Sequence, residues 1–118
     1  MSKGRKKEPD RNDCLAMLAS LGIATPEEFE ELARATLEGA GVAVRAMLSH
    51  GGVSAADAPD IIQDTALKAI GRVRKYDPLR AQWRTLTGII AAGKASEYNR
   101  RNAKRREIPL ESLPPNTI

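Results

Sequence analysis

The sequence is poor in aromatic residues, in cysteine and in histidine. Aromatic residues make up 3% of the 118 residues, so the core must be built from Leu, Ile, Val, Met and Ala, which suits packed helices better than a β-sandwich. The four aromatic residues are Phe29, Tyr76, Trp83 and Tyr98. A single cysteine, Cys14, excludes an intrachain disulfide, and a single histidine, His50, is too few for a Cys/His zinc site.

Long hydrophobic segments are also missing. No apolar run approaches the roughly 18 residues of a membrane span, and no hydrophobic stretch follows the basic N-terminus as in a secretory signal. The chain is 42% hydrophobic and 29% charged, as in soluble globular proteins. We therefore expect one domain in a cytoplasmic protein that has no membrane partner.

The net charge of +4 hides a strong asymmetry along the chain. Residues 1–11 carry a net charge of +3, residues 12–71 carry −6 and residues 72–107 carry +8. An acidic half joined to a basic half suggests two different partners, with a polyanion for the basic half. The alternative is that both runs are merely solvated helix faces.

Hydrophobic periodicity predicts an all-α domain of three main helices and one short N-terminal helix. Residues 1–11 have no apolar periodicity and are expected to be disordered, whereas residues 108–118 contain three prolines and predict an extended tail. Between them, residues 12–107 form the predicted domain. Its helices are expected over 12–21, 26–50, 58–75 and 83–107.

Two helix starts are marked by local signals. Thr25 is a predicted N-cap, with Pro26 in the first turn and Glu28 closing a capping box. Asp57 is expected to cap the third helix, with Pro59 held in its first turn. No stretch alternates long enough to predict a strand.

The sequence contains no catalytic constellation, and we predict a protein that is not an enzyme and uses no cofactor or metal. Gly39-Ala40-Gly41 lacks the third glycine and the preceding strand of a dinucleotide loop, so close helix packing is the better interpretation. Asp57, Asp60 and Asp64 share a helical face and could hold Mg²⁺, but a cap with an acidic docking surface is favoured.

Two stretches of the chain resemble a known family. Residues 57–69 read Asp-Ala-Pro-Asp-Ile-Ile-Gln-Asp-Thr-Ala-Leu-Lys-Ala, and residues 76–86 read Tyr-Asp-Pro-Leu-Arg-Ala-Gln-Trp-Arg-Thr-Leu. Together with Ile89-Ile90-Ala91 and Arg100-Arg101, they resemble region two of bacterial sigma factors of the extracytoplasmic-function class. The similarity spans roughly residues 27–113. Pro59, Leu86 and Gly93 depart from the family pattern, which usually has Glu, Trp and Asn there.

The resemblance implies a helical domain that binds the β′ clamp helices of core RNA polymerase and the promoter's minus-ten element as single-stranded DNA, aiding promoter melting. It allows an anti-sigma factor as a further partner. The family's second domain, a helix-turn-helix that reads the minus-thirty-five element, is absent, so the chain is expected to be a fragment or a stand-alone region two. The residues expected to bind polymerase are Asp60, Gln63, Asp64 and Lys68. Those expected to bind DNA are Tyr76, Arg80, Gln82, Arg84, Lys94, Tyr98, Asn99, Arg100, Arg101, Lys104 and Arg105.

The residues themselves fit this division. Asp60, Gln63 and Asp64 are predicted to face outward while Ile61, Ile62 and Leu67 pack inward. Trp83 either stacks on an unpaired base or packs in the core, and its place in the pattern favours the core. Two other hypotheses remain. One is an adaptor that occupies polymerase or a sigma partner without reading a promoter, and the other is an unrelated basic helical nucleic-acid-binding module.

Overall fold

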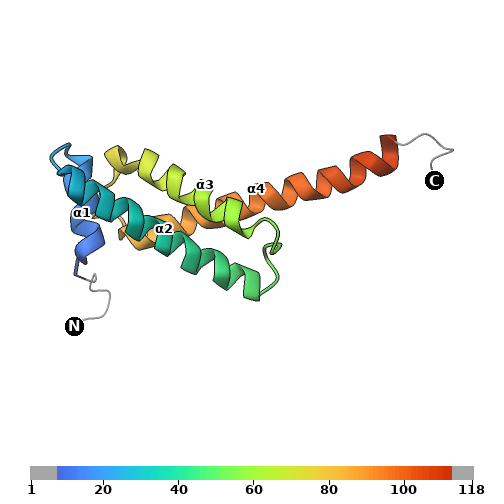
Figure 1. Ribbon diagram of the computed structural model, residues 1–118, viewed down its shortest axis with the longest axis horizontal. Helices are drawn as coiled ribbons and strands as arrows, with labels where there is room; N and C mark the ends of the chain where they lie inside the picture. The colour runs from blue at the N-terminus through green and yellow to red at the C-terminus, as the bar shows by residue number, and fades with distance from the viewer. Residues whose placement is uncertain (1–7, 113–118) are drawn as a thin grey trace.

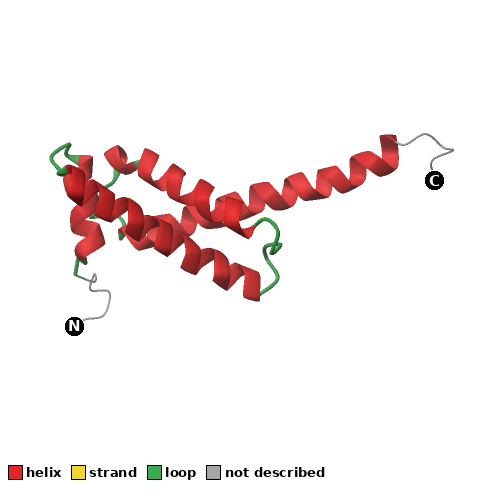
Figure 2. Ribbon diagram, viewed as in Figure 1, coloured by secondary structure: helices red, strands yellow, loops and turns green. Residues whose placement is uncertain are grey.

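The computed structural model describes residues 8–112 of the chain, with side chains to Lys104. This part of the chain is all-α and contains no strand (Figure 2). Its elements are α1 (Arg11–Ser20), α2 (Pro26–Ser49), α3 (Ala58–Gly71), the short 3₁₀ helix η1 (Val73–Lys75) and α4 (Trp83–Ser112). The predicted fold class, three main helices and a short N-terminal one, is confirmed.

The three long helices lie against one another, and α1 crosses one end of them (Figure 1). α4 is longer than its neighbours, so its C-terminal end projects beyond the bundle. None of the helices in the described part combines the length and apolarity that crossing a membrane requires. One end of α4 is therefore built into the core and the other is presented to its surroundings.

Local signals set most of the helix ends. Thr25 and Glu28 form the predicted reciprocal capping box at the start of α2, with Pro26 in the first turn. After α1 and α2 the chain turns at Gly22 and Gly51, whose φ angles are +76° and +78°. Only glycine adopts such angles without strain, so these two residues stop the helices where the sequence predicts.

The start of α3 differs from the prediction. Asp57 occupies the N-cap position, but its side chain makes no capping hydrogen bond. Its backbone has helical angles, which turn the carboxylate away from the first turn of α3. The carboxylate instead accepts a hydrogen bond from Asn102 Nδ2 at 2.7 Å. Asp57 thus connects α3 to α4.

The boundaries of the domain also shift. α1 begins at Arg11, capped by Asp10, so helix replaces the last residue predicted as disordered. The prediction for residues 1–7 lies outside the described residues. α4 continues to Ser112, although an extended tail is predicted from residue 108. Proline disfavours the interior of a helix because it has no backbone N–H, which is why the sequence predicts a tail here, but α4 continues through Pro109.

The core has two parts. The first lies where α1, α2, α3 and η1 meet the start of α4, and it contains both buried aromatic residues, Tyr76 and Trp83. Trp83 is 1% exposed, which confirms the predicted core position. The second lies between α2, α3 and the middle of α4, and it is built from Val44, Ile61 and small residues of α4.

Some apolar side chains that periodicity places inside are exposed. Leu67 is 65% exposed and Ile89 63%, so the prediction that Leu67 packs inward is wrong. Leu67 follows Gln63 by one turn on the outer side of α3, while Ile61 and Thr65 occupy the inner side. A three-helix bundle covers only one side of each helix, so an apolar residue outside that stripe stays in solvent.

Candidate functional site

The outer face of α3 carries the residues predicted to bind polymerase. Asp60 and Gln63 are exposed, and Asp64 and Lys68 are half-buried. Leu67 lies between them in sequence and adds an exposed apolar side chain. The face therefore combines carboxylate, amide and aliphatic groups on successive helical turns.

Asp64 and Tyr98 join this face to α4. The Tyr98 hydroxyl donates to Asp64 Oδ2 at 2.7 Å. The hydrogen bond, aided by burial and by the negative charge of Asp64, raises the pKa of Tyr98. The Arg101 guanidinium lies over the Tyr98 ring, 4.6 Å from its centre. The structure thus brings together one residue predicted to bind polymerase and two predicted to bind DNA.

Two asparagines fasten α4 to the connection between α2 and α3. Asn99 Nδ2 donates to the Gly52 carbonyl oxygen at 2.8 Å, and Asn102 donates to Asp57 as described above. The amide of Asn99, a residue predicted to bind DNA, therefore already has a partner inside the protein. Asn99 as a whole is exposed, and a side-chain amide has a second N–H and an oxygen with which it can bind another molecule.

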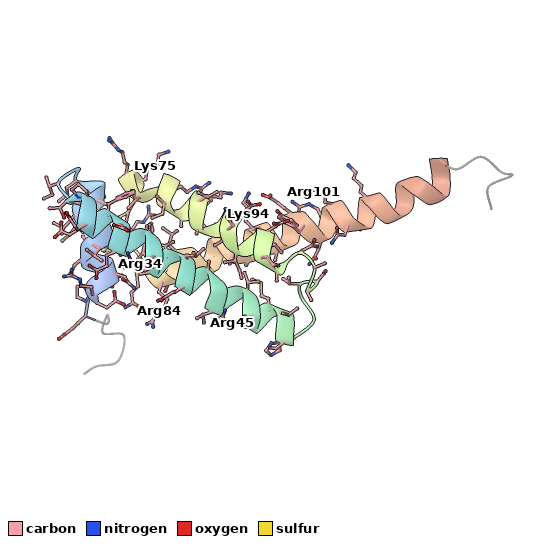
Figure 3. All side chains as sticks on the ribbon, in the orientation of Figure 1. Arg34, Arg45, Lys75, Arg84, Lys94 and Arg101 are labelled. Carbon is pink, nitrogen blue, oxygen red and sulfur yellow. The ribbon has the colours of Figure 1, made fainter. Side chains whose placement is uncertain are left out.

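Basic side chains gather where α4 leaves the bundle. Arg100, Arg101 and Lys104 are all exposed (Figure 3 shows Arg101). Lys94 is less available because it is half-buried and pairs with Glu97 at 3.4 Å. The side chain of Arg105 lies outside the described residues. Three of the cations predicted to bind DNA are thus exposed where α4 projects from the bundle.

The other end of α4 holds Tyr76 in the core. Its hydroxyl donates to the Ala81 carbonyl oxygen at 2.9 Å. Its ring meets Trp83 edge to face, with 5.3 Å between centres. Burial, followed by the nearby charge of Asp13, raises the pKa of Tyr76. Tyr76 is 8% exposed and is therefore not part of the basic surface on which the sequence places it.

Asp13 is a structural residue that sequence analysis misses. It is 3% exposed, and its Oδ1 accepts the backbone N–H of Trp83 at 2.7 Å. Its Oδ2 accepts the N–H of Asp10 at 3.1 Å, which closes the capping box of α1. One carboxylate thus caps two helices. The spacing of Asp10 and Asp13 is a readable capping signal, but nothing local points to Trp83, seventy residues away.

Arg80, Gln82 and Arg84 surround the start of α4. Arg80 and Arg84 are exposed, and Gln82 is half-buried. Arg80 and Gln82 line a hollow of about 340 Å³ beside the buried Asp13. Figure 3 shows that Arg84 and Arg101 lie far apart along α4. The exposed cations predicted to bind DNA therefore form two groups, one at the start of α4 and one where α4 leaves the bundle.

No group of His, Cys, Asp and Glu side chains in the described part of the chain is arranged to hold a metal ion. Asp57 and Asp64 point to Asn102 and Tyr98 instead. Comparison of the chain with models of protein families, with curated proteins and with solved structures finds no match.

Proposed function

We propose that this chain is a sigma region-two-like protein of transcription initiation that binds the β′ subunit of core RNA polymerase through α3 and single-stranded minus-ten DNA through α4. The proposal rests on the motifs of residues 57–69 and 76–86. The observation that carries it is the contact between Asp64 and Tyr98, because it makes the acidic and basic surfaces neighbours. Polymerase and melted DNA would then be held side by side.

The α3 face suits an arginine-rich helical partner. Carboxylates and an amide on consecutive turns accept charge-assisted hydrogen bonds from guanidinium groups, and Leu67 offers an apolar contact between them. The polar side chains around Leu67 are expected to orient the partner more than to increase its affinity. The predicted interface is therefore centred on Gln63 and Leu67.

Binding of core polymerase tests this face. Asp60 and Gln63 are exposed, so we expect replacement of both with alanine to leave the fold intact. We expect polymerase affinity to fall by at least ~1 kcal/mol, about fivefold. The matched control replaces Glu27 and Glu38 of α2, which are also exposed. Equal affinity of the two double variants would remove α3 from the interface.

Single-stranded DNA tests the basic surface. Each phosphate contact contributes about 0.7 log units of affinity per tenfold change in salt. Replacing Arg100 and Lys104 with alanine is expected to flatten the salt dependence by one to two contacts, whereas Arg45→Ala leaves it unchanged. The measurement is a salt titration by fluorescence anisotropy. A flat response of the unmodified protein would refute DNA binding.

One observation favours a second candidate, an adaptor that binds polymerase without reading a promoter. Tyr76, Tyr98 and Asn99 are predicted to bind DNA, but the hydroxyl or amide group of each has a partner inside the protein. Comparing a minus-ten-like strand with a scrambled strand, both on core polymerase, separates the two candidates. Preference for the matched strand supports promoter reading, and equal binding supports the adaptor.

A further inference from the structure

An apolar groove lies at the end of the bundle, where α1 turns into α2 and α3 ends. It has a volume of about 540 Å³ and is open to solvent. Its apolar walls are Ala19, Ala24, Pro26, Phe29, Ile70 and Val73. No residue assigned to polymerase or DNA lines it, so an inference about this groove is independent of the proposed function.

Large apolar side chains in the groove and next to its lining residues remain in solvent. Phe29, which lines the groove, is 40% exposed, and Leu21 and Ile23, which flank the lining residue Gly22 in the sequence, are 64% and 61% exposed. Gly71, at the end of α3, widens the groove: a Cβ there would meet no atom within 4 Å. Apolar side chains gathered at a hollow, unlike single ones scattered over a surface, mark a contact site.

The charge around the groove is unbalanced. Arg74 is the charged residue among its lining, and Arg72 and Lys75 are exposed on the same turn (Lys75 is labelled in Figure 3). Among the described residues these three cations form no ion pair. On the opposite wall, Glu28 closes the capping box of α2, Glu30 and Glu31 are in ion pairs, and Glu27 is exposed. The one charge in the lining itself is that of Arg74, so the wall formed by the end of α3 and η1 is positive.

We propose that the groove binds an amphipathic helix of a partner protein, with its apolar side chains in the hollow and an acidic flank against Arg74. A concave apolar channel accepts the ridge that a helix forms with residues at i, i+3, i+4 and i+7. A flat membrane surface does not enter such a hollow. The open side would leave a small ligand largely in water, whereas ligand pockets enclose most of theirs.

Two synthetic peptides test the proposal. Both have about 16 residues, roughly four helical turns, and the same leucine spacing, but one carries Glu on its flank and the other Lys. We expect the Glu peptide to bind in fluorescence anisotropy and the Lys peptide to bind at least about tenfold more weakly. Vesicles of anionic phospholipid serve as the competing surface. Binding of vesicles without binding of the Glu peptide overturns the proposal, as does binding of neither.

A variant that fills the groove locates the binding site. Gly71→Leu places a side chain in the open space of the groove. We expect it to lower the affinity for the Glu peptide at least about tenfold. Gly93→Leu is the matched control, because a Cβ at Gly93 also meets nothing within 4 Å and the residue lies on α4, away from the groove. Equal binding by the two variants would show that the peptide binds elsewhere.

Reversing the charge at Arg74 tests the acidic flank. Arg74→Glu is expected to reverse the order of the two binding affinities, so that the Lys peptide binds more tightly than the Glu peptide. Arg45→Glu, near the far end of α2 (Figure 3), should leave the order unchanged. Circular dichroism of each variant confirms that it is folded. An unchanged order in a folded Arg74→Glu protein contradicts the proposed orientation.

Discussion

The two parts of the core are stabilised by different means. At the start of α4, Trp83 and Tyr76 form an edge-to-face pair, and buried hydrogen bonds connect them to Asp13 and Thr36. In the middle of α4 the core is aliphatic, and its hydrogen bonds lie at the rim. The rim pairs are Tyr98 with Asp64, Asn99 with Gly52 and Asn102 with Asp57.

We therefore expect the aromatic part of the core to be rigid, and the side chains at the rim of the aliphatic part to be able to change partners. Polar groups in the first part are closed off from water, so breaking one contact leaves a donor or acceptor unsatisfied. Rim groups can exchange their partner for water or for a bound molecule at little cost. The residues that bind partners in our proposal therefore lie at the end where side chains can change partners, and the aromatic end supports them.

The largest predicted effect is at Trp83. Trp83→Ala removes a side chain that is 1% exposed and is expected to lower the free energy of unfolding by about 3–5 kcal/mol. Trp83→Phe keeps most of the volume but loses the hydrogen bond from Nε1 to Thr36 Oγ1, which is 2.8 Å long, and should cost about 1–3 kcal/mol. Urea denaturation measures both. A loss below about 1 kcal/mol for alanine would show that the aromatic end is not the rigid one.

Asp13 comes next. Asp13→Ala leaves the N–H groups of Trp83 and Asp10 without their acceptor, and we expect a loss of about 1–3 kcal/mol. Asp10→Ala removes an exposed cap of the same helix and should cost roughly 1 kcal/mol. Asp13→Asn keeps an oxygen that can accept the N–H of Trp83. We expect its loss in the free energy of unfolding to lie between those of Asp13→Ala and Asp10→Ala. Equal losses for Asp13→Ala and Asp10→Ala would mean that Asp13 caps only α1.

The sequence predicts contacts within a few residues far better than contacts between distant ones. Thr25 and Glu28 satisfy each other within one turn, so their residue types suffice to predict the start of α2. The place of Trp83 in the family pattern also favours the core, where it lies. The contact of Asp13 with Trp83 depends on how α1 crosses α4, which no local pattern records.

The candidate site was predictable in residue type but not in arrangement. Charge and motif correctly placed Asp60 and Gln63 on the surface of α3 and the basic side chains Arg100 and Lys104 on that of α4. They did not predict that Tyr98 binds Asp64, because that hydrogen bond depends on the register of α3 against α4. Leu67 was predicted to pack inward but is exposed. Periodicity alone does not tell how wide a stripe of α3 the neighbouring helices cover.

Alkaline pH distinguishes the two tyrosines. The unfolded-state pKa of tyrosine is about 10, and burial raises the pKa of Tyr76 in the folded protein. The unfolded chain then loses this proton at a lower pH than the folded protein. The neutral hydroxyl of Tyr76 therefore contributes to the stability of the folded protein. This contribution is complete below about pH 10 and is lost as the pH rises through the folded-state pKa of Tyr76.

The pH dependence is measured by phenolate absorbance and by denaturation at each pH. In Tyr98→Phe, which leaves Tyr76 as the single tyrosine, we expect the phenolate to appear only as the protein unfolds. In Tyr76→Phe the loss of stability above pH 10 should be smaller than in the unmodified protein. Ionisation of Tyr76 near pH 10 in a folded protein would contradict its burial.

The smallest predicted effect is at Tyr98, and it tests the adaptable end. Tyr98→Phe removes the hydroxyl that donates to Asp64 but keeps the ring beneath Arg101. Because Asp64 is half-buried and can bind water instead, we expect the free energy of unfolding to fall by only about 0.5–1 kcal/mol. Urea denaturation of Tyr98→Phe beside Trp83→Phe compares the two ends through the loss of one hydrogen bond each. A larger loss at Tyr98 than at Trp83 would reverse the assignment, because the contact between α3 and α4 would then be rigid and unable to open for a partner.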